Sequence, residues 1–272
     1  MKTVLITGSS SGIGRDTVIH FQREGWNVAA TMRRPEDETE LNQLENVQVL
    51  RLDATDRESI ISAVNTTIET FGNLDVVINN AGYGLAGPLE AVKPDQLTRQ
   101  YDTNVFGPIY VMQATLPHFR AQKSGLFINI SSVGGRITLP FMTLYHGTKY
   151  ALEGISEALN YELNPLGIRV KLVEPGGVKT DFAGRSLDMM SDPNTTDYDE
   201  ITQKVLATYQ EPSREDAFST GADIAKVIFT AATDGTAQIR YPAGNDAIEM
   251  LGQRPTMSDE AYVEMTAKNF GL

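Results

Sequence analysis

The segment KTVLITGSSSGIGRDTVIHFQREG (residues 2–25) joins an apolar run, a glycine-rich turn and a helical pattern. The β-branched residues over 2–7 predict a strand. Apolar residues then recur about once per helical turn until Gly25, which predicts a helix over 13–24. A strand that passes through a tight turn directly into a helix is the first unit expected of an alternating α/β fold.

The turn between this strand and this helix reads TGSSSGIG (7–14). Such a turn frees backbone N–H groups and points the N-terminus of a helix at an anion, normally a pyrophosphate. Its spacing is G-x-x-x-G-x-G instead of the common G-x-G-x-x-G, so a tight turn rich in small residues is the alternative interpretation. The interpretation of this turn as an anion-binding site therefore depends on other features of the chain.

Strand and helix patterns continue to alternate along the chain. The strands are apolar on both faces, which is typical of a parallel sheet covered on both sides. We therefore predict a single-domain, doubly wound, Rossmann-type α/β fold with about seven strands. No repeat or linker interrupts the chain before about residue 180, so one domain over 1–272 is expected. Further strands are predicted at 27–32, 47–52, 74–79, 126–130, 168–173 and 237–241, and further helices at 36–44, 60–71, 95–123 (broken at Gly107-Pro108) and 145–164.

The stretch over 184–220 differs from the rest of the chain. Eight acidic residues lie within 188–216, with Met189-Met190 and two prolines in the same region. Long irregular segments in a compact domain are usually lids or binding loops. We predict a helical substrate lid here, and a solvated surface insertion is the alternative.

Composition limits the classes of partner. The chain has 272 residues, of which 41% are hydrophobic and 21% charged, the balance of a globular protein. Lys and Arg number 23 against 35 Asp and Glu, and the net charge of −12 repels nucleic acid and anionic membranes. No apolar run approaches the ~18 residues of a membrane span, and no signal-peptide pattern is present. Cysteine is absent, which excludes thiol chemistry and fits a reducing compartment. We expect a cytoplasmic protein that acts on a small molecule.

Polar or small residues follow several of the predicted strands. In an open α/β sheet the carboxyl edge of the strands is where ligands bind. Taken singly, each group has a structural explanation as a turn or a strand stop. Together they predict a ligand-binding edge. The groups are Asp53, Asn79-Asn80-Ala81-Gly82, Ser131-Ser132 and Pro175-Gly176.

Positive charge follows the second strand, in Thr31-Met32-Arg33-Arg34. In dinucleotide folds an acidic residue near this point holds the ribose hydroxyls, whereas an arginine accommodates a 2′-phosphate. Met32 supplies no carboxylate, so the pattern favours NADP(H) over NAD(H). Two solvated arginines are the alternative.

Tyr145 and Lys149 lie four residues apart at the start of a predicted helix and share one face. A free tyrosine titrates near ~10, and a neighbouring ammonium stabilises the phenolate and lowers that pKa. A pKa nearer the working pH suits general acid–base catalysis. An ordinary surface pair is the alternative.

Other polar residues are weaker candidates. Asn104 lies in a helical pattern, where Asn is a mediocre helix former, and an exposed position would explain it. His20, His118 and His146 have no spacing suited to a metal cluster, so no metal site is predicted. His146 is expected to point away from the face that carries Tyr145. The absence of H-x-x-x-H and G-x-S-x-G argues against metalloenzyme and hydrolase functions.

These segments together resemble the short-chain dehydrogenase/reductase family. The stretch over 131–159 is similar to the hydroxysteroid dehydrogenase and bacterial ketoreductase branches of that family. The matching features follow the family's order and spacing, and they are TGSSSGIG (7–14), Asp53, NNAG (79–82), Asn104, INISS (128–132), YHGTK (145–149) and PGGVKT (175–180).

The resemblance implies catalytic roles for four residues. Tyr145 would be the acid in carbonyl reduction and the base in alcohol oxidation. Ser132, selected over Ser131 by its spacing to Tyr145, would hold and polarise the substrate oxygen. Lys149 would bind the nicotinamide ribose and lower the pKa of Tyr145. Asn104 would hold a water molecule that links Lys149 to bulk solvent.

The resemblance also implies contacts with the cofactor. Ser11 stands where some NADP(H)-dependent members carry a basic residue, so NADP(H) is preferred on the strength of the two arginines and NAD(H) remains possible. The residues that would cradle the cofactor are Gly8, Gly12, Ile13 and Gly14, those that would meet a 2′-phosphate are Ser11, Arg33 and Arg34, and those that would flank the adenine are Asp53 and Ala54. The residues that would line the rest of the cofactor are Asn79, Ala81, Gly82, Pro175, Gly176, Val178 and Thr180, the last two at the carboxamide.

We therefore expect an NADP(H)-dependent oxidoreductase that moves a hydride between nicotinamide and a ketone or secondary alcohol. The resemblance implies a homodimer or homotetramer formed through the long helices. A non-catalytic NADP(H)-binding redox sensor is one alternative, and an NAD-dependent alcohol dehydrogenase, epimerase or dehydratase on a related fold is another. Candidate apolar substrate contacts, for which core or lid packing is the alternative, are Phe141, Met142, Met189 and Met190.

Overall fold

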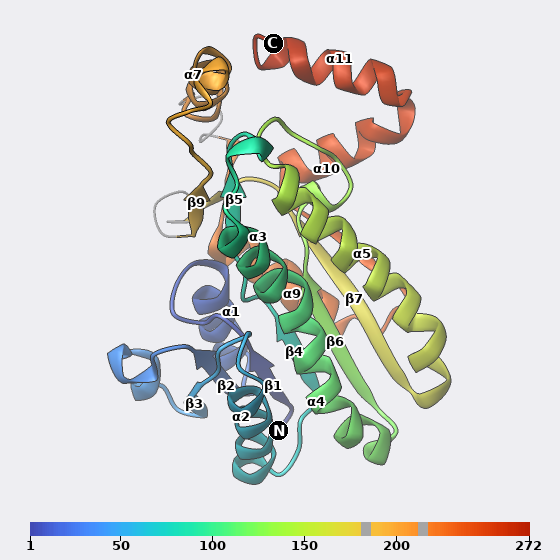
Figure 1. Ribbon diagram of the computed structural model, residues 1–272. Coiled ribbons are helices and arrows are strands. Elements are labelled where there is room, and N and C mark those ends of the chain that lie inside the picture. Colours follow the sequence, from blue (N-terminus) through green and yellow to red (C-terminus); the bar gives the residue numbers. More distant parts are fainter. Residues whose placement is uncertain (181–185, 212–216) are drawn as a thin grey trace.

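The computed structural model describes residues 1–180, 186–211 and 217–272. Seven strands form one parallel sheet in the order β11-β7-β6-β4-β1-β2-β3. Figure 1 shows the sheet between two layers of helices, which confirms the predicted doubly wound fold. Strand order reverses beside β1, and this switch point opens a crevice at the carboxyl ends of the strands. The strands are β1 (Thr3–Ile6), β2 (Asn27–Met32), β3 (Val47–Arg51), β4 (Val76–Asn79), β6 (Gly125–Ile130), β7 (Ile168–Pro175) and β11 (Arg240–Ala243).

Helices cover both faces of the sheet. Helices α1 (Gly12–Arg23) and α9 (Gly221–Thr233) pack together on one face. Helices α2 (Arg57–Phe71), α4 (Gly107–Gln122) and α5 (Thr143–Leu163) cover the other. This two-sided cover explains why the strands are apolar on both faces.

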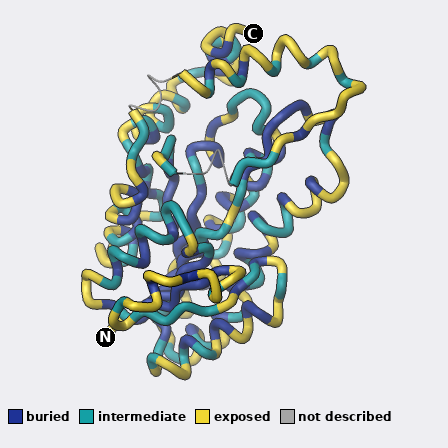
Figure 2. The backbone as a smooth tube through the Cα atoms, turned by 90° about the vertical axis from the view of Figure 1, so that its left-hand side faces the viewer, coloured by how far each residue is buried: buried dark blue, intermediate teal, exposed yellow. Residues whose placement is uncertain are grey.

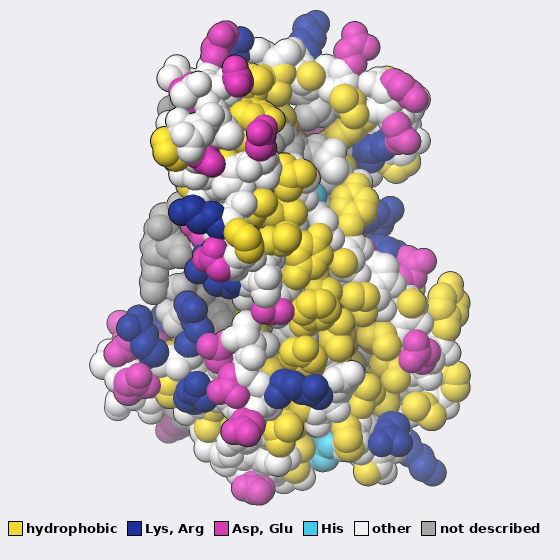
Figure 3. Space-filling model, in the orientation of Figure 1, with side chains coloured by type: hydrophobic (Ala, Val, Ile, Leu, Met, Phe, Trp, Pro, Cys, Tyr) yellow, Lys and Arg dark blue, Asp and Glu magenta, His cyan; other side chains and the backbone are white. Residues whose placement is uncertain are grey.

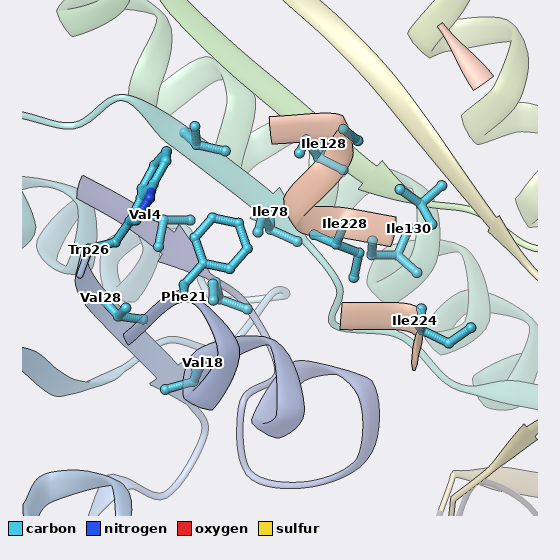
Figure 4. Close-up of a cluster of buried hydrophobic side chains, with 14 of the residues drawn as sticks. Val4, Val18, Phe21, Trp26, Val28, Ile78, Ile128, Ile130, Ile224 and Ile228 are labelled. Carbon is cyan, nitrogen blue, oxygen red and sulfur yellow. The ribbon is translucent and has the colours of Figure 1, made fainter. Parts of the chain in front are cut away.

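Alternate residues of each strand enter two apolar clusters. Val4 and Ile78 pack against Phe21 on the α1/α9 face, as Figure 4 shows. Their neighbours Leu5 and Val77 point into the opposite cluster. All five side chains are fully buried, and each contributes about 1.5–3 kcal/mol relative to exposure. Figure 2 shows the buried chain running through the middle of the molecule.

Shorter elements lie beyond the carboxyl ends of the strands, at the top of Figure 1. Two small parallel pairs join segments that are far apart in the sequence, β5 (Gly84–Ala86) with β9 (Leu187–Met189) and β8 (Val178–Lys179) with β10 (Ser219–Thr220). The helices of this region are α7 (Asp199–Tyr209), α10 (Asn245–Gln253) and α11 (Asp259–Asn269). Short 3-10 turns occur at Leu89–Ala91, Val133–Gly135, Asn164–Leu166, Thr196–Tyr198 and Arg254–Thr256.

The prediction of one helix over 36–44 is wrong. The chain forms two 3-10 turns instead, Pro35–Asp37 and Leu41–Gln43. The carboxylate of Glu38 accepts hydrogen bonds from the amides of Glu40 and Leu41, both at 2.8 Å. This local capping gives the backbone N–H groups partners that a continuous helix would otherwise supply.

The helical region over 95–123 is divided as its proline suggests. Helix α3 (Pro94–Tyr101) passes through a π-helical turn (Asp102–Phe106) into α4. Pro108 lies in the first turn of α4, where its missing N–H leaves no hydrogen bond unmade. The π-turn, which sequence periodicity does not reveal, inserts an extra residue at Asn104's turn of helix.

The predicted lid region over 184–220 contains β9, α7 and β10 in its described part. Its residues 184–185 and 212–216 lie outside the described residues. The last strand of the sheet begins three residues later than predicted, at Arg240. In the described ranges, none of the helices combines the length and apolar character that a bilayer crossing needs.

Candidate active site

A cleft of about 1300 Å³ opens at the carboxyl ends of the strands. One end of its wall is formed by the glycine turn that follows β1. The other end contains Tyr145 and Lys149 from α5 and Ser132 from the loop after β6. The cleft therefore joins the predicted anion site to the predicted acid–base pair in one continuous space.

The glycine turn brings backbone close to backbone. Gly8 has a φ of +71°, and a Cβ there would lie 2.8 Å from the Cα of Ala81. A Cβ on Gly14 would lie 2.2 Å from the carbonyl oxygen of Gly8. Thr7 fixes the turn against the end of β4, because its hydroxyl accepts from the amides of Asn80 and Ala81, both at 3.0 Å. Only glycine fits the two positions.

The N-terminus of α1 points its first turn into the cleft. Gly12, Ile13 and Gly14 line the wall. The N-cap residue, Ser11, makes no side-chain capping bond, and the first turn holds no acidic residue. Free amides and the positive end of the helix dipole thus remain available to an anion.

The two arginines after β2 lie in different surroundings. Met32 and Arg33 line the cleft together with Asp53. Arg34 is not in that wall; its side chain is 76% exposed and its Nε lies 3.1 Å from a carboxylate oxygen of Asp37. Of the two arginines, the structure therefore brings only Arg33 to the cleft wall, which also contains Ser11, because successive residues after a strand point in different directions.

The two asparagines at the end of β4 also separate. Asn79 is buried within the sheet, where its amide donates to the side-chain oxygen of Asn129 at 2.8 Å. Asn80, the first residue after the strand, lines the cleft. The predicted cofactor contact at Asn79 thus belongs to the sheet, and its neighbour occupies the wall.

Ser132, Tyr145 and Lys149 converge on one point of the cleft. The Nζ of Lys149 lies 5.7 Å from the centre of the Tyr145 ring and donates to the carbonyl of Ile130 at 2.8 Å. The hydroxyls of Ser132 and Tyr145 hydrogen-bond to each other. The amide of Gly134 donates to the Ser132 oxygen at 3.0 Å, which fixes that side chain.

Burial dominates the electrostatics of this group. It raises the pKa of the Tyr145 phenol, and the hydrogen bond from Ser132 lowers it in part. Burial also lowers the pKa of Lys149 to about 8, against the opposing charge of Glu153. The expected lowering of the tyrosine pKa by Lys149 is not found in the protein alone, because removal from water penalises the phenolate more than the neighbours stabilise it.

Asn104 lies behind the cleft wall, in the π-turn, and is buried. Its amide donates to the carbonyl of Tyr83 at 2.8 Å and to the hydroxyl of Thr148 at 3.2 Å. Its oxygen accepts from the amide of Tyr83 at 3.1 Å. The exposed position that helix propensity suggests is wrong, and the residue connects the π-turn, the start of β5 and α5.

His146 is turned away from the cleft, as expected. Its Nδ1 lies 2.9 Å from the carbonyl of Gly134, and its Nε2 accepts from the amide of Leu139 at 2.8 Å. The ring therefore braces the loop that carries Ser132. Within the described ranges, no three His, Cys, Asp or Glu side chains form a group that could hold a metal ion.

The cleft wall also contains residues that no motif identifies. The guanidinium of Arg99 forms an ion pair with Asp188 and lies 5.4 Å from the ring of Tyr83. Met190, a candidate apolar contact, is buried in a separate cluster with Leu85. The sequence gives one indication that Tyr83 lines the cleft, its position directly after NNAG (79–82). Asn80 and Ser131, from the predicted ligand-binding edge, line the wall, and the wall residues beyond those predicted are Ser10, Met32, Leu52, Thr55, Tyr83, Arg99, Thr103, Ile130, Gly177, Lys179, Ser186, Leu187, Asp188 and Phe218.

The chain is similar to known proteins in both sequence and structure. The sequence model of the short chain dehydrogenase family matches residues 2–191. An uncharacterised oxidoreductase of Schizosaccharomyces pombe is 40% identical over 248 residues, covering 89% of this chain and all of the relative. A short-chain dehydrogenase from Streptomyces avermitilis is similar in structure, with a TM-score of 0.80 and 30% identity over 97% of this chain and 94% of its own. The protein ElxO with NADP bound has a TM-score of 0.72 and 28% identity over 88% of this chain and 95% of its own.

Proposed function

This chain belongs to the short-chain dehydrogenase/reductase family and is an enzyme that acts on C=O or CH–OH groups with a nicotinamide cofactor; from that premise we propose that it is an NADP(H)-dependent reductase of ketones, with Tyr145 as the proton donor. The observation that carries the proposal is the convergence of Ser132, Tyr145 and Lys149 in a cleft that is continuous with the glycine turn.

The residues of the cleft fit a dinucleotide. The crowded glycines leave no room for a side chain between the turn and its neighbours, and the first turn of α1 supplies free amides for a pyrophosphate. When bound, a reduced nicotinamide supplies the hydride that a carbonyl carbon accepts. The protein's own part is to hold the carbonyl oxygen and to give it a proton.

Tyr145 is suited to give that proton. Its raised pKa keeps the phenol protonated at neutral pH, the state that a donor needs. The hydroxyls of Ser132 and Tyr145 hold the carbonyl oxygen between them, and the Tyr145 proton moves to that oxygen as negative charge develops. The Lys149 ammonium, fixed on the carbonyl of Ile130, stabilises the phenolate left behind.

Asn104 and the segment over 184–220 support this reaction. We assign to Asn104, through its contacts with Tyr83 and Thr148, the role of holding a water molecule that returns a proton towards Lys149. We assign the segment over 184–220 to a substrate lid. Its strand β9 pairs with β5 and adds Leu187 to the cleft wall.

A 2′-phosphate on the cofactor is favoured by the charge at the end of β2. Arg33 lines the cleft there, and Met32 occupies the position where an acidic residue would hold free ribose hydroxyls. Ser11 lies in the same wall and supplies a hydroxyl. We therefore assign NADP(H) as the preferred cofactor, with NAD(H) bound more weakly.

An apolar surface favours self-association. Figure 3 shows hydrophobic side chains gathered over α4 and α5. Tyr161 is 80% exposed, and Phe106, Tyr150 and Leu166 are each more than 40% exposed. Patches of this kind mark interfaces between proteins. We propose a homodimer or homotetramer through this face, and a monomeric molar mass by light scattering would exclude it.

Replacing the proposed proton donor tests the function. Tyr145→Phe should bind NADPH normally, measured by cofactor fluorescence, but should lose at least about a hundredfold of its ketone-dependent NADPH oxidation, the usual contribution of a general acid. Tyr161→Phe, on the same helix but outside the cleft, keeps the apolar ring and removes only a hydroxyl, so it is the matched control and should keep full activity. Unchanged turnover in Tyr145→Phe refutes the assignment, and saturable NADPH binding without turnover by the wild type on a broad ketone panel supports a redox sensor instead.

A further inference from the structure

Four side chains spaced by four residues lie along one face of α5: Tyr145, Lys149, Glu153 and Glu157. Lys149 and Glu153 are buried, with 7% and 4% exposure. Glu157 lies farther along the helix and is about half exposed. The line leads from Tyr145 through a buried cation, Lys149, and a buried acid, Glu153, to a partly exposed acid, Glu157.

A second buried acid, Glu174 near the end of β7, meets this line. Its carboxyl group hydrogen-bonds to that of Glu153, and it is only 2% exposed. Arg240 from β11 lies 2.9 Å from Glu153, 2.6 Å from Glu157 and 3.8 Å from Glu174. Arg136 lies 3.6 Å from Glu174. Two arginines thus face three acids.

The hydrogen bond between the two buried acids requires a proton. One oxygen of each, Oε1 of Glu153 and Oε1 of Glu174, has no donor from any other described residue. Two carboxylates in contact cannot both ionise at low cost. Burial and the charge of Glu153 raise the pKa of Glu174 to about 7, against the two arginines that lower it. Glu174 is therefore the acid that keeps its proton, and the guanidinium of Arg240 donates to the carboxylate of Glu153 at 2.9 Å.

Two further titratable groups on other elements, Asp246 and His146, bond to partners of their own. On α10, Asp246 lies against Gly176 and accepts from the amide of Gly177 at 2.6 Å. The His146 ring is bonded to the loop after β6. Within the described ranges, the cations that act on the pair are Arg136, Arg240 and Lys149.

The charge of Glu153 acts on the pKa of Lys149. Burial favours the neutral amine, and Glu153 opposes this effect by raising the lysine pKa. A neutral lysine no longer stabilises a phenolate at Tyr145. The state of Lys149 at neutral pH therefore depends on a carboxylate one helical turn away.

We propose that Glu153 is a positioning residue that keeps Lys149 in its ammonium form, and that Glu174 holds the proton that lets the two acids lie together. The inference rests on the role proposed above for Lys149. Glu153 does not touch the reacting atoms; it acts through the charge of its neighbour.

The first test is the titration of Lys149 by NMR in protein labelled with [ε-13C]lysine, without cofactor or substrate. Lys149→Arg identifies the resonance. The wild-type midpoint is expected at about 8, and Glu153→Gln should lower it by about one unit. Glu157→Gln, which contacts the same arginine one turn farther from Lys149, should leave it unchanged. An unchanged midpoint in Glu153→Gln overturns the proposal.

A second variant keeps the test valid if Glu153→Gln does not fold. Glu153→Asp retains the charge but moves it one methylene group away from Lys149, so the midpoint of the Lys149 titration should fall by less than one unit. A midpoint equal to that of the wild type would contradict the proposal. These titrations do not depend on catalysis. The loss of activity in Tyr145→Phe therefore tests the proposed function separately.

The proton on Glu174 is tested by thermal unfolding between pH 5 and pH 8. Its folded pKa, about 7, lies above the ordinary 4.5, so the folded protein holds a proton that the unfolded chain has released. Stability from this group is complete below about pH 4.5 and is lost as pH rises through 7. Glu174→Gln cannot ionise, so its Tm relative to the wild type should rise by a few degrees from pH 5 to pH 8. If the difference in Tm between Glu174→Gln and the wild type stays the same from pH 5 to pH 8, Glu174 does not hold the proton.

Discussion

The two ends of the cleft are built from different parts of the chain. At the cofactor end, the site is formed mainly by backbone atoms. Gly8 and Gly14 bring the turn against the end of β4, and the first turn of α1 offers its amides. At the substrate end, side chains from separate elements meet, as Arg99 from α3 does with Asp188 from β9. A backbone site depends on local turn geometry, whereas a side-chain site depends on how distant segments pack.

The largest effect is expected where the cofactor end is most crowded. A Cβ in Gly14→Ala would lie 2.2 Å from the oxygen of Gly8, so the turn must shift. Displacement of this kind costs about 1–3 kcal/mol, and NADPH affinity measured by fluorescence titration should fall at least about tenfold. Gly154→Ala on α5, which meets nothing within 4 Å, is the control and should bind normally. Normal binding by both variants would show that the backbone approach is not what forms the site.

The next effect separates the two arginines after β2. Arg33→Ala removes the cleft-lining cation and should weaken NADPH binding by up to about tenfold, the low end of the value of a charge-assisted hydrogen bond because the side chain is exposed, while NADH affinity changes little. Arg34→Ala is the matched control, because Arg34 is exposed and paired with Asp37. Calorimetric titration with each cofactor gives the ratio of the NADPH and NADH dissociation constants for each variant. Equal losses for NADPH and NADH in Arg33→Ala would count against a 2′-phosphate contact.

The smallest effect is expected at the substrate end. The pair of Arg99 and Asp188 is partly exposed, and such pairs are worth about 0.2–1 kcal/mol. Asp188→Asn should therefore change the KM for a ketone by about two- to fivefold and leave kcat unchanged. Asp192→Asn, in the same acidic segment, should change neither. A large loss of kcat in Asp188→Asn would mean that this end takes part in the chemistry.

The same contrast explains what the sequence reveals. The strand-and-helix alternation, the glycine turn and the placement of Tyr145 and Lys149 on one face of a helix follow from short-range rules, and the structure has all of them. Whether Asn79 or Asn80 enters the cleft depends on the direction of a single side chain at a strand end. Such a choice is made by the neighbouring strand, not by local propensity.

Other errors have equally specific causes. The expected helix over 36–44 gives way to two short turns because Glu38 caps the amides of Glu40 and Leu41. Burial, which no motif encodes, raises the pKa of Tyr145 in the protein without cofactor. The contacts of Arg99 and Tyr83 join elements that are distant in sequence, so no spacing rule could have indicated them.

The most direct test of the central claim follows the transfer of the hydride, which requires the proton donor. Wild-type protein is incubated with a reducible ketone and NADPH in which both C4 hydrogens are deuterium, and the alcohol is analysed by mass spectrometry. Deuterium should enter the alcohol with the wild type, and Tyr145→Phe, with NADPH bound to the same extent, should form almost none. Equal deuterium transfer by the two proteins would contradict the assignment of Tyr145 as the proton donor.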